Sequence, residues 1–185
     1  MATPWVTRWR VRAGYPLSIL YLWLASPTFE AIAIGAAIAV AGLCIRAAAA
    51  GNLRKHETLT TAGPYAWTRN PLYLGSSLLA TGFAVAGHSI WAALVIAIYF
   101  FVFYPAVMKR EEGELRIRYG AAFDAYAKQV PLFWPRPPKR SSAQGAPRDS
   151  GGFSWNQYCR NREYQAALGV LFAIVLVWLR MKMRH

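Results

Sequence analysis

The amino-acid sequence predicts an all-α fold: a polytopic bundle of about five transmembrane helices, with an amphipathic helix on the cytoplasmic side. Two observations lead to this prediction. Of the 185 residues, 56% are hydrophobic and only 16% are charged, whereas soluble domains carry roughly 25% charged residues. The apolar residues also gather in long runs separated by basic segments, which is typical of a membrane protein.

The apolar runs define the expected membrane segments, which are Tyr15–Ala25, Phe29–Ala50, Pro71–Ala86, Ile90–Val107 and Gln165–Leu179. A full span needs about 20 apolar residues, so the first run is expected to be short, tilted or partly inserted, and the fifth to span. Small residues in the second run predict close approach of another helix, namely Gly35, Ala36, Ala39 and Gly42. We expect a single domain over 1–185, with a core at 40–135, a flexible basic loop at 135–152 and a C-terminal membrane helix at 165–179.

The charge is strongly basic, with 21 Lys and Arg against 8 Asp and Glu and a net charge of +13. Because the basic residues flank apolar runs, they favour the anionic face of a bilayer over nucleic acid as the partner. The positive-inside rule then predicts a cytoplasmic N-terminus and a site facing the cytoplasm, in a bacterial inner membrane. The tail is in conflict with this rule if the fifth run spans, because Arg180, Lys182 and Arg184 would lie outside.

The joint between the third and fourth runs is only Gly87-His88-Ser89. So short a joint predicts an antiparallel helical hairpin, which places the residues before Pro71 and those after Val107 on the same side of the membrane. Beyond the hairpin, aromatic and apolar residues recur at helical spacing between 109 and 130. They predict an amphipathic cytoplasmic helix, or two helices broken at Gly120.

The hairpin brings three polar stretches together as a candidate site, which are Glu57–Thr61, Gly63–Gly75 and Arg110–Glu112. At the start of the third run, Asn70 is a favourable helix N-cap and Pro71 suits the first turn, whose free N–H groups attract a carboxylate or phosphate. Arg69 is placed to clamp such a group. Tyr65 and Tyr73 are suited to stacking on a base or facing a sulfonium cation. Gly75 permits close approach of a backbone or a ligand.

The third stretch carries Glu111 and Glu112, which can accept hydrogen bonds from ribose hydroxyls or a ligand ammonium. Taken singly, each of these features also has an ordinary explanation. Asn-Pro starts many helices, tyrosines gather at membrane edges, and paired glutamates are often solvated. No Cys or His cluster has the spacing of a metal site, so no metal is expected.

The order and spacing of these residues resemble a known family. Residues 59–75, then Glu111-Glu112, then Arg118-Tyr119-Gly120 with Tyr126, Val130 and Pro131 are similar to the isoprenylcysteine carboxyl methyltransferases and their phospholipid methyltransferase-like bacterial relatives. The similarity covers about residues 40–135. Asn70 stands where many members have His, so a role that needs a titrating imidazole is not expected here. Lys109 or Arg110 stands near the position of a substrate-binding arginine in the eukaryotic enzymes.

The resemblance implies an S-adenosylmethionine pocket on the cytoplasmic side, capped by the segment after the glutamates, with S-adenosylhomocysteine as product. It implies that the cofactor is lined by Glu57, Thr58, Leu59, Thr60, Tyr65, Asn70, Pro71, Leu72, Tyr73 and Glu111. Arg69 is expected to act at the reacting centre, with Glu111 and Glu112 as further catalytic candidates.

The expected function is transfer of a methyl group to a lipid-like or prenylated acceptor, with a carboxylate as the favoured acceptor group. A carboxylate is ionised at pH 7 and needs no strong base. The alternatives are phospholipid N-methylation, for which a glutamate would take the proton, a relative of the membrane sterol reductases, and a non-enzymatic membrane or transport protein. Against transport, the apolar runs carry almost no ionisable residues at mid-membrane depth.

Overall fold

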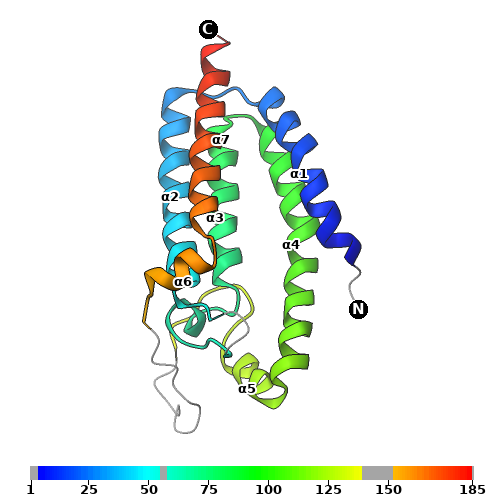
Figure 1. Cartoon of the computed structure of the whole chain (residues 1–185). Helices are drawn as coiled ribbons and strands as arrows, with labels where there is room; N and C mark the ends of the chain where they lie inside the picture. The colour runs from blue at the N-terminus through cyan, green and yellow to red at the C-terminus, as the bar shows by residue number, and fades with distance from the viewer. Residues whose placement is uncertain (1–3, 55–57, 139–151, 185) are drawn as a thin grey trace.

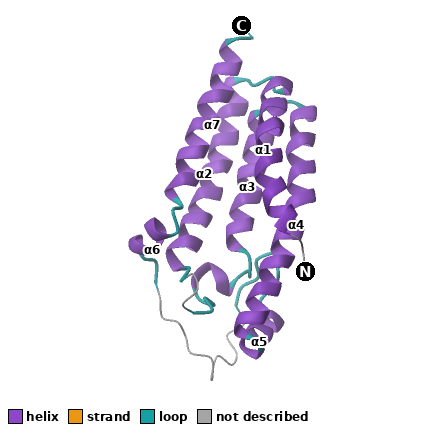
Figure 2. Ribbon diagram, turned by 45° about the vertical axis from the view of Figure 1, so that its right-hand side comes forward, coloured by secondary structure: helices purple, strands orange, loops and turns teal. Residues whose placement is uncertain are grey.

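The structure, a computed structural model, describes residues 4–54, 58–138 and 152–184 (Figure 1). Helices dominate these residues and no strand occurs in them, which confirms the predicted all-α fold (Figure 2). The elements are α1 (Pro4–Leu24), α2 (Phe29–Asn52), the 3-10 helix η1 (Gly63–Ala66), α3 (Pro71–Ala86), α4 (Ile90–Tyr119), α5 (Ala121–Gln129), α6 (Trp155–Arg160) and α7 (Tyr164–Lys182).

Among the described helices, α2, α4 and α7 are long and apolar enough to cross a membrane, by length and composition. The apolar helix α3 is shorter, at 16 residues. Helix α1 begins well before the predicted first run, because its N-terminal turns continue through the basic residues that precede Tyr15. The predicted number of about five membrane segments is therefore approximate, and the chain is an integral membrane protein.

Helix α4 is longer than the predicted fourth run. It continues through the Lys109–Tyr119 segment, and its 30 residues correspond to about 45 Å, against about 30 Å for the hydrocarbon core. The segment after Lys109, expected as a cytoplasmic helix of its own, is instead the continuation of α4, because nothing after Val107 interrupts the hydrogen bonds of the helix. The break falls at Gly120, where φ is 51°, as the sequence predicted. The charged end of α4 thus projects beyond the bundle.

Paired glycines hold α2 and α3 in close contact, antiparallel to each other (Figure 1). A Cβ on Gly35 would lie 2.4 Å from the carbonyl oxygen of Gly82, and a Cβ on Gly42 would lie 2.7 Å from that of Gly75. The close approach predicted from the small residues of α2 is confirmed at Gly35 and Gly42. This contact fixes α3, whose first turn carries the site, against α2.

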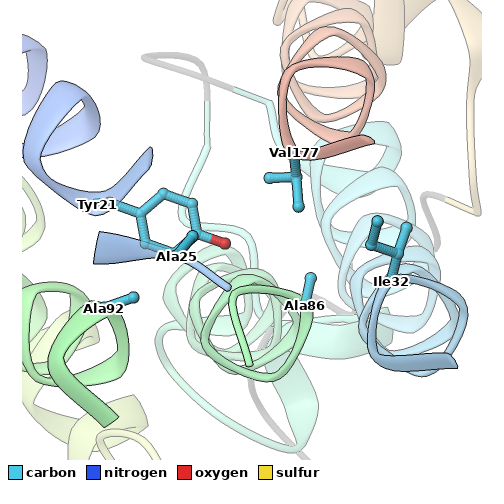
Figure 3. Packing of buried hydrophobic residues seen from close by; sticks show 6 residues of the cluster. All are labelled: Tyr21, Ala25, Ile32, Ala86, Ala92 and Val177. Atoms are coloured by element: carbon cyan, nitrogen blue, oxygen red, sulfur yellow. The ribbon is translucent and has the colours of Figure 1, made fainter. Parts of the chain in front are cut away.

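The bundle is tightly packed at the end opposite α5. The α3–α4 turn meets the α1–α2 turn there, where the Ser26 N–H donates to the Gly87 carbonyl at 2.8 Å. Close by, the Tyr21 hydroxyl donates to the Phe83 carbonyl at 2.7 Å. A buried cluster fills this end, made of Tyr21, Ala25, Ile32, Ala86, Ala92 and Val177 (Figure 3). From this end the ribbons of α3 and α4 diverge toward α5 (Figure 1).

The tail lies at the same tightly packed end, because α7 runs from α6 toward that end (Figure 1). Arg180 donates from Nε to the Leu22 carbonyl at 2.9 Å and from Nη2 to the Trp23 carbonyl at 3.0 Å. Arg184 donates to the hydroxyl of Ser26. Arg180 thus satisfies two carbonyls at the C-terminus of α1, which have no partner within that helix, and Arg184 holds the turn that follows it. Two of the basic residues that conflict with the positive-inside rule therefore have a structural role.

Replacing Arg180 by glutamine is expected to lower the thermal stability of the protein. Hydrogen bonds that involve a charged group contribute about 1.5–3 kcal/mol, and a chain of this size loses roughly 2–4 °C of melting temperature per kcal/mol. Tryptophan fluorescence of the detergent-purified variant measures the shift. Lys182→Gln is the matched control, since Lys182 only stacks over Trp178 at 5.7 Å. Equal melting temperatures for the two variants would contradict the prediction.

Candidate functional site

The α3–α4 hairpin brings the segment around Arg69, at the start of α3, together with Glu111 and Glu112, as the sequence predicted. Arg69 Nη1 lies 2.6 Å from Glu112 Oε1. One turn into α3, the Tyr73 hydroxyl donates to Glu111 Oε1 at 2.5 Å. Both contacts join the start of α3 to the projecting part of α4, across the space where the two helices diverge.

These residues line a cavity of about 660 Å³ at this end of the bundle. Of the predicted site residues that the structure describes, all except Gly75 border it. The predicted residues in the lining are Thr58, Leu59, Thr60, Tyr65, Arg69, Asn70, Pro71, Leu72, Tyr73, Glu111 and Glu112. The volume is within the range of about 300–1,000 Å³ that is usual for small-molecule sites. The lining combines aromatic rings, carboxylates and guanidinium groups from α2, α3, α4 and α5.

Helix α5 covers the cavity, and the segment after it lies against the start of α3. After the break at Gly120, α5 packs Phe123, which is 1% exposed, against the lining. The Tyr126 hydroxyl donates to the Tyr65 carbonyl at 2.7 Å. Segment 131–136 then crosses the start of α3, where the Arg69 N–H donates to the Pro131 carbonyl at 2.9 Å. The predicted amphipathic covering helix is thus present as α5.

Asn70 occupies the N-cap position of α3, but its side chain makes no capping hydrogen bond. Its amide Nδ2 instead donates to the Leu132 carbonyl at 3.0 Å, which ties segment 131–136 to the start of α3. The prediction that Asn70 caps the helix through its side chain is wrong, because this long-range bond takes the amide. The N–H groups of Tyr73 and Leu74 bond to the Asn70 carbonyl, and Pro71 has none. Among the described groups, the Leu72 N–H is therefore left for a ligand.

Two predicted cofactor contacts have other outcomes. Gly75 does not border the cavity: it packs against α2, where a Cβ would lie 2.5 Å from Arg46 Cγ. The close approach expected at Gly75 is therefore to a helix and not to a ligand. Glu57 lies outside the described residues.

Arg69 has one polar group that the protein leaves unused. Its Nε is buried and has no hydrogen-bond partner in the part of the chain that the structure describes. The side chains of Arg69 and Glu112 are only 15% and 22% exposed. A buried N–H without a partner costs free energy, of the order of 1–3 kcal/mol. A ligand oxygen in the cavity would recover it.

The buried tyrosines of the cavity stay protonated. Burial raises the pKa of the Tyr65 hydroxyl well above its usual range, and the charges of Tyr126, Glu111 and Glu163 raise it further against a smaller opposite effect of Arg46. Burial likewise raises the pKa of Tyr126, although nearby Arg69 opposes this. Both phenols are therefore neutral hydrogen-bonding groups rather than bases.

The sequence interpretation missed a second arginine of the cavity. Arg46 of α2 borders it and forms an ion pair with Glu163, at 2.5 Å between Nε and Oε1. Ser76, Tyr99 and Tyr104 border the cavity as well. The available signal was Arg46 itself, since an ionisable residue within an apolar helix usually has a partner and a function.

Replacing Asn70 by alanine is expected to loosen segment 131–136 from the start of α3. The change removes one buried hydrogen bond, with a loss of roughly 1 kcal/mol. Limited chymotrypsin digestion at Leu132 and Phe133 should become faster, since the protease needs an extended, accessible backbone. The exposed Thr81, which bonds only within α3, provides the control Thr81→Ala. Cleavage of Asn70→Ala at the wild-type rate would refute the role given to this amide.

Comparison with known proteins adds two kinds of similarity. Residues 9–122 match the phospholipid methyltransferase family. The chain is 40% identical over 83 residues to the nickel-cobalt-cadmium resistance protein NccN of Alcaligenes xylosoxydans xylosoxydans. It is 37% identical over 83 residues to the cobalt-zinc-cadmium resistance protein CzcN of Cupriavidus metallidurans.

Each of these two matches covers 45% of this chain and 38% of the relative, so the similarity spans well under half of the relatives' length. No solved structure matches the chain. Among the described residues, no group of three or more His, Cys, Asp or Glu side chains is placed to hold a metal ion. The family match covers more than half of the sequence. The chain therefore belongs to the phospholipid methyltransferase family.

Proposed function

We propose that this protein transfers a methyl group from S-adenosylmethionine to a lipid-like acceptor delivered from the membrane, with a carboxylate as the favoured acceptor group. The observation that carries the proposal is the cavity where Arg69 and Glu112 meet, bordered by Arg69, whose buried Nε has no hydrogen-bond partner among the described residues. The family supports methyl transfer as the reaction.

The residues of the cavity fit S-adenosylmethionine. Tyr73 and Tyr104 meet edge to face, with ring centroids 5.5 Å apart, and such rings attract a sulfonium cation. Glu111 is suited to accept from ribose hydroxyls or the ammonium group, and the Leu72 N–H to donate to an anionic group. When bound, S-adenosylmethionine would supply a methyl group activated by the positive sulfur to which it is attached.

Arg69 would orient the acceptor. Its Nε is available to donate to a carboxylate oxygen, while its Nη1 stays on Glu112. Alignment of the reacting atoms is the main requirement for a simple displacement. A carboxylate acceptor is already ionised at pH 7, so no residue has to remove a proton. Neutral Tyr65 and Tyr126, and a Glu112 engaged by Arg69, agree with a site that has no strong base.

Methylation of a phospholipid amine is the second candidate. The family description favours it, and so does the position of two carboxylates in the cavity wall. An ammonium head group must lose a proton before it attacks, and Glu111 or Glu112 would accept it. The two candidates therefore differ in whether a glutamate is needed as a base.

We place the cavity on the cytoplasmic side, as expected for the inner membrane of a bacterium. Arg54, Arg69, Arg110 and Arg118 lie at this end, whereas the turns Ser26–Thr28 and Gly87–Ser89 contain neither Lys nor Arg. An excess of positive charge marks cytoplasmic ends. Labelling of single cysteines placed in the 87–89 turn, with a membrane-impermeant reagent on intact cells, tests this side assignment.

Binding of radiolabelled S-adenosylmethionine to the purified protein tests the cofactor. Saturable binding is expected, followed by label transfer to a farnesylated cysteine with a free carboxylate. Transfer to phosphatidylethanolamine vesicles instead would select the N-methylation candidate. A folded, monodisperse protein that binds no S-adenosylmethionine at millimolar concentration would contradict both methyl-transfer candidates. It would favour a non-enzymatic membrane function.

A further inference from the structure

Arg46 is held in the wall of the cavity by three groups from distant parts of the chain. Its Nε donates to Glu163 Oε1 at 2.5 Å. Its Nη1 donates to Ser76 Oγ at 2.5 Å and to the Leu72 carbonyl at 3.4 Å. The guanidinium plane is thereby fixed by α3 on one side and by the residue that precedes α7 on the other.

This arrangement lies within the bundle and not at its rim. Arg46 is six residues from the end of α2, and Ser76 is five residues from the start of α3. At 1.5 Å per residue these positions are roughly 9 Å and 7.5 Å from the helix ends. An arginine at such depth is costly unless it is paired, and it then usually has a function. Glu163, 8% exposed, provides the pairing charge.

The guanidinium still has donors to spare. Arginine carries five N–H groups, and those on Nε and Nη1 are used by the contacts to Glu163, Ser76 and Leu72. The structure gives Nη2 no hydrogen-bond partner among the described residues, while 21% of the side chain remains accessible and borders the cavity. Nη2 is therefore a fixed donor that a ligand can reach.

Glu163 belongs to a C-terminal unit that is separately anchored to α2. The Asn161 amide donates to the carbonyls of Ala50 and Leu53, at 2.8 and 3.0 Å. The ring of Phe153 fills the space beside Gly51. These contacts place α6 and the start of α7 beside the end of α2 (Figure 1). This unit lies outside residues 9–122, the part that matches the family.

We propose that Arg46 is a second oxyanion-binding residue of the cavity, and that Glu163 and Ser76 are its positioning residues. Through Nη2 it binds a carboxylate or phosphate group of a ligand, which is the group that the planar guanidinium recognises best. The site is then incomplete without the C-terminal unit. This inference rests on the proposed function, because the oxyanion belongs either to the amino-acid part of S-adenosylmethionine or to the membrane-borne acceptor.

Binding measurements on purified protein in nanodiscs test the proposal. Arg46→Gln is expected to lose roughly 10- to 100-fold in affinity for the ligand that carries the oxyanion, the usual effect of one charge-assisted hydrogen bond. Glu163→Gln is expected to lose a smaller factor, and that loss should vanish in the Arg46→Gln background. Such non-additivity distinguishes positioning from a general loss of stability. The exposed pair Arg116–Asp124, 60% and 48% exposed, supplies the control Arg116→Gln/Asp124→Asn.

Two arms identify the source of the oxyanion. If it is the donor's carboxylate, wild type binds S-adenosylmethionine more tightly than its decarboxylated form, and Arg46→Gln binds both alike. If the oxyanion belongs to the acceptor, Arg46→Gln leaves donor binding unchanged and raises the KM for farnesylated cysteine. Should Arg46→Gln not fold, Arg46→Gln/Glu163→Gln leaves no unpaired charge and replaces it. Wild-type donor affinity and wild-type KM in these variants would overturn the inference, whereas failure of the wild type to bind donor would overturn the proposed function.

Discussion

Replacing Arg69 by glutamine is expected to lower the rate of methyl transfer by at least about 100-fold, the effect of losing one aligned, positively charged group at a reacting centre. The side chain is the one that joins α3 to Glu112 and leaves its Nε for a ligand. Initial rates with saturating radiolabelled donor measure the change. Arg116→Gln, at an exposed ion pair of α4 and outside the cavity lining, is the matched control.

A loss of rate through misfolding is separable from a loss of chemistry. Removing Arg69 alone leaves Glu112 partly buried without its counter-charge, which is destabilising. The double variant Arg69→Gln/Glu112→Gln removes both charges, so its melting temperature should recover toward that of the wild type while its rate stays low. If Arg69→Gln retains full activity, Arg69 has no place at the reacting centre.

Replacing Gly82 by leucine is expected to separate α2 from α3 and to lower both stability and activity. The new Cβ would lie 2.6 Å from the Gly35 carbonyl oxygen and 3.0 Å from the Ala39 nitrogen, and these are backbone atoms that move only with the helix. Overpacking costs about 1–3 kcal/mol or more. A chain of this size loses roughly 2–4 °C of melting temperature for each kcal/mol. The displaced α3 would also carry Ser76 away from Arg46.

Gly169 of α7 provides the matched control for this substitution. It also lies in an apolar helix, but a Cβ there meets nothing within 4 Å. Gly169→Leu should therefore melt close to the wild-type temperature in the same detergent and retain activity. Equal melting temperatures for Gly82→Leu and Gly169→Leu would show that the close α2–α3 contact does not support the bundle.

The sequence was most informative where local features fix the geometry. A three-residue joint can only reverse the chain, so the meeting of the segment around Arg69 with the twin glutamates followed from the positions of Gly87–Ser89. Gly120 was predicted as a break, and it adopts a positive φ there. The helical period of α3 rules out one part of the predicted site. Tyr73 and Gly75 are two residues apart, which is about 200° around a helix. They cannot both face one cavity, and Gly75 faces α2.

The remaining features depend on packing between distant segments. Asn70 bonds to Leu132 and not to its own helix, and Arg46 meets Glu163 across 117 positions of sequence. The local sequence pattern does not predict such contacts, because they depend on how each helix is rotated and on the path of the chain after α5. The sequence by itself determined a basic membrane bundle with a polar corner opposite twin glutamates. Only the tertiary structure decided which side chains turn inward, because a buried charge takes whichever partner the packing of the helices brings within reach.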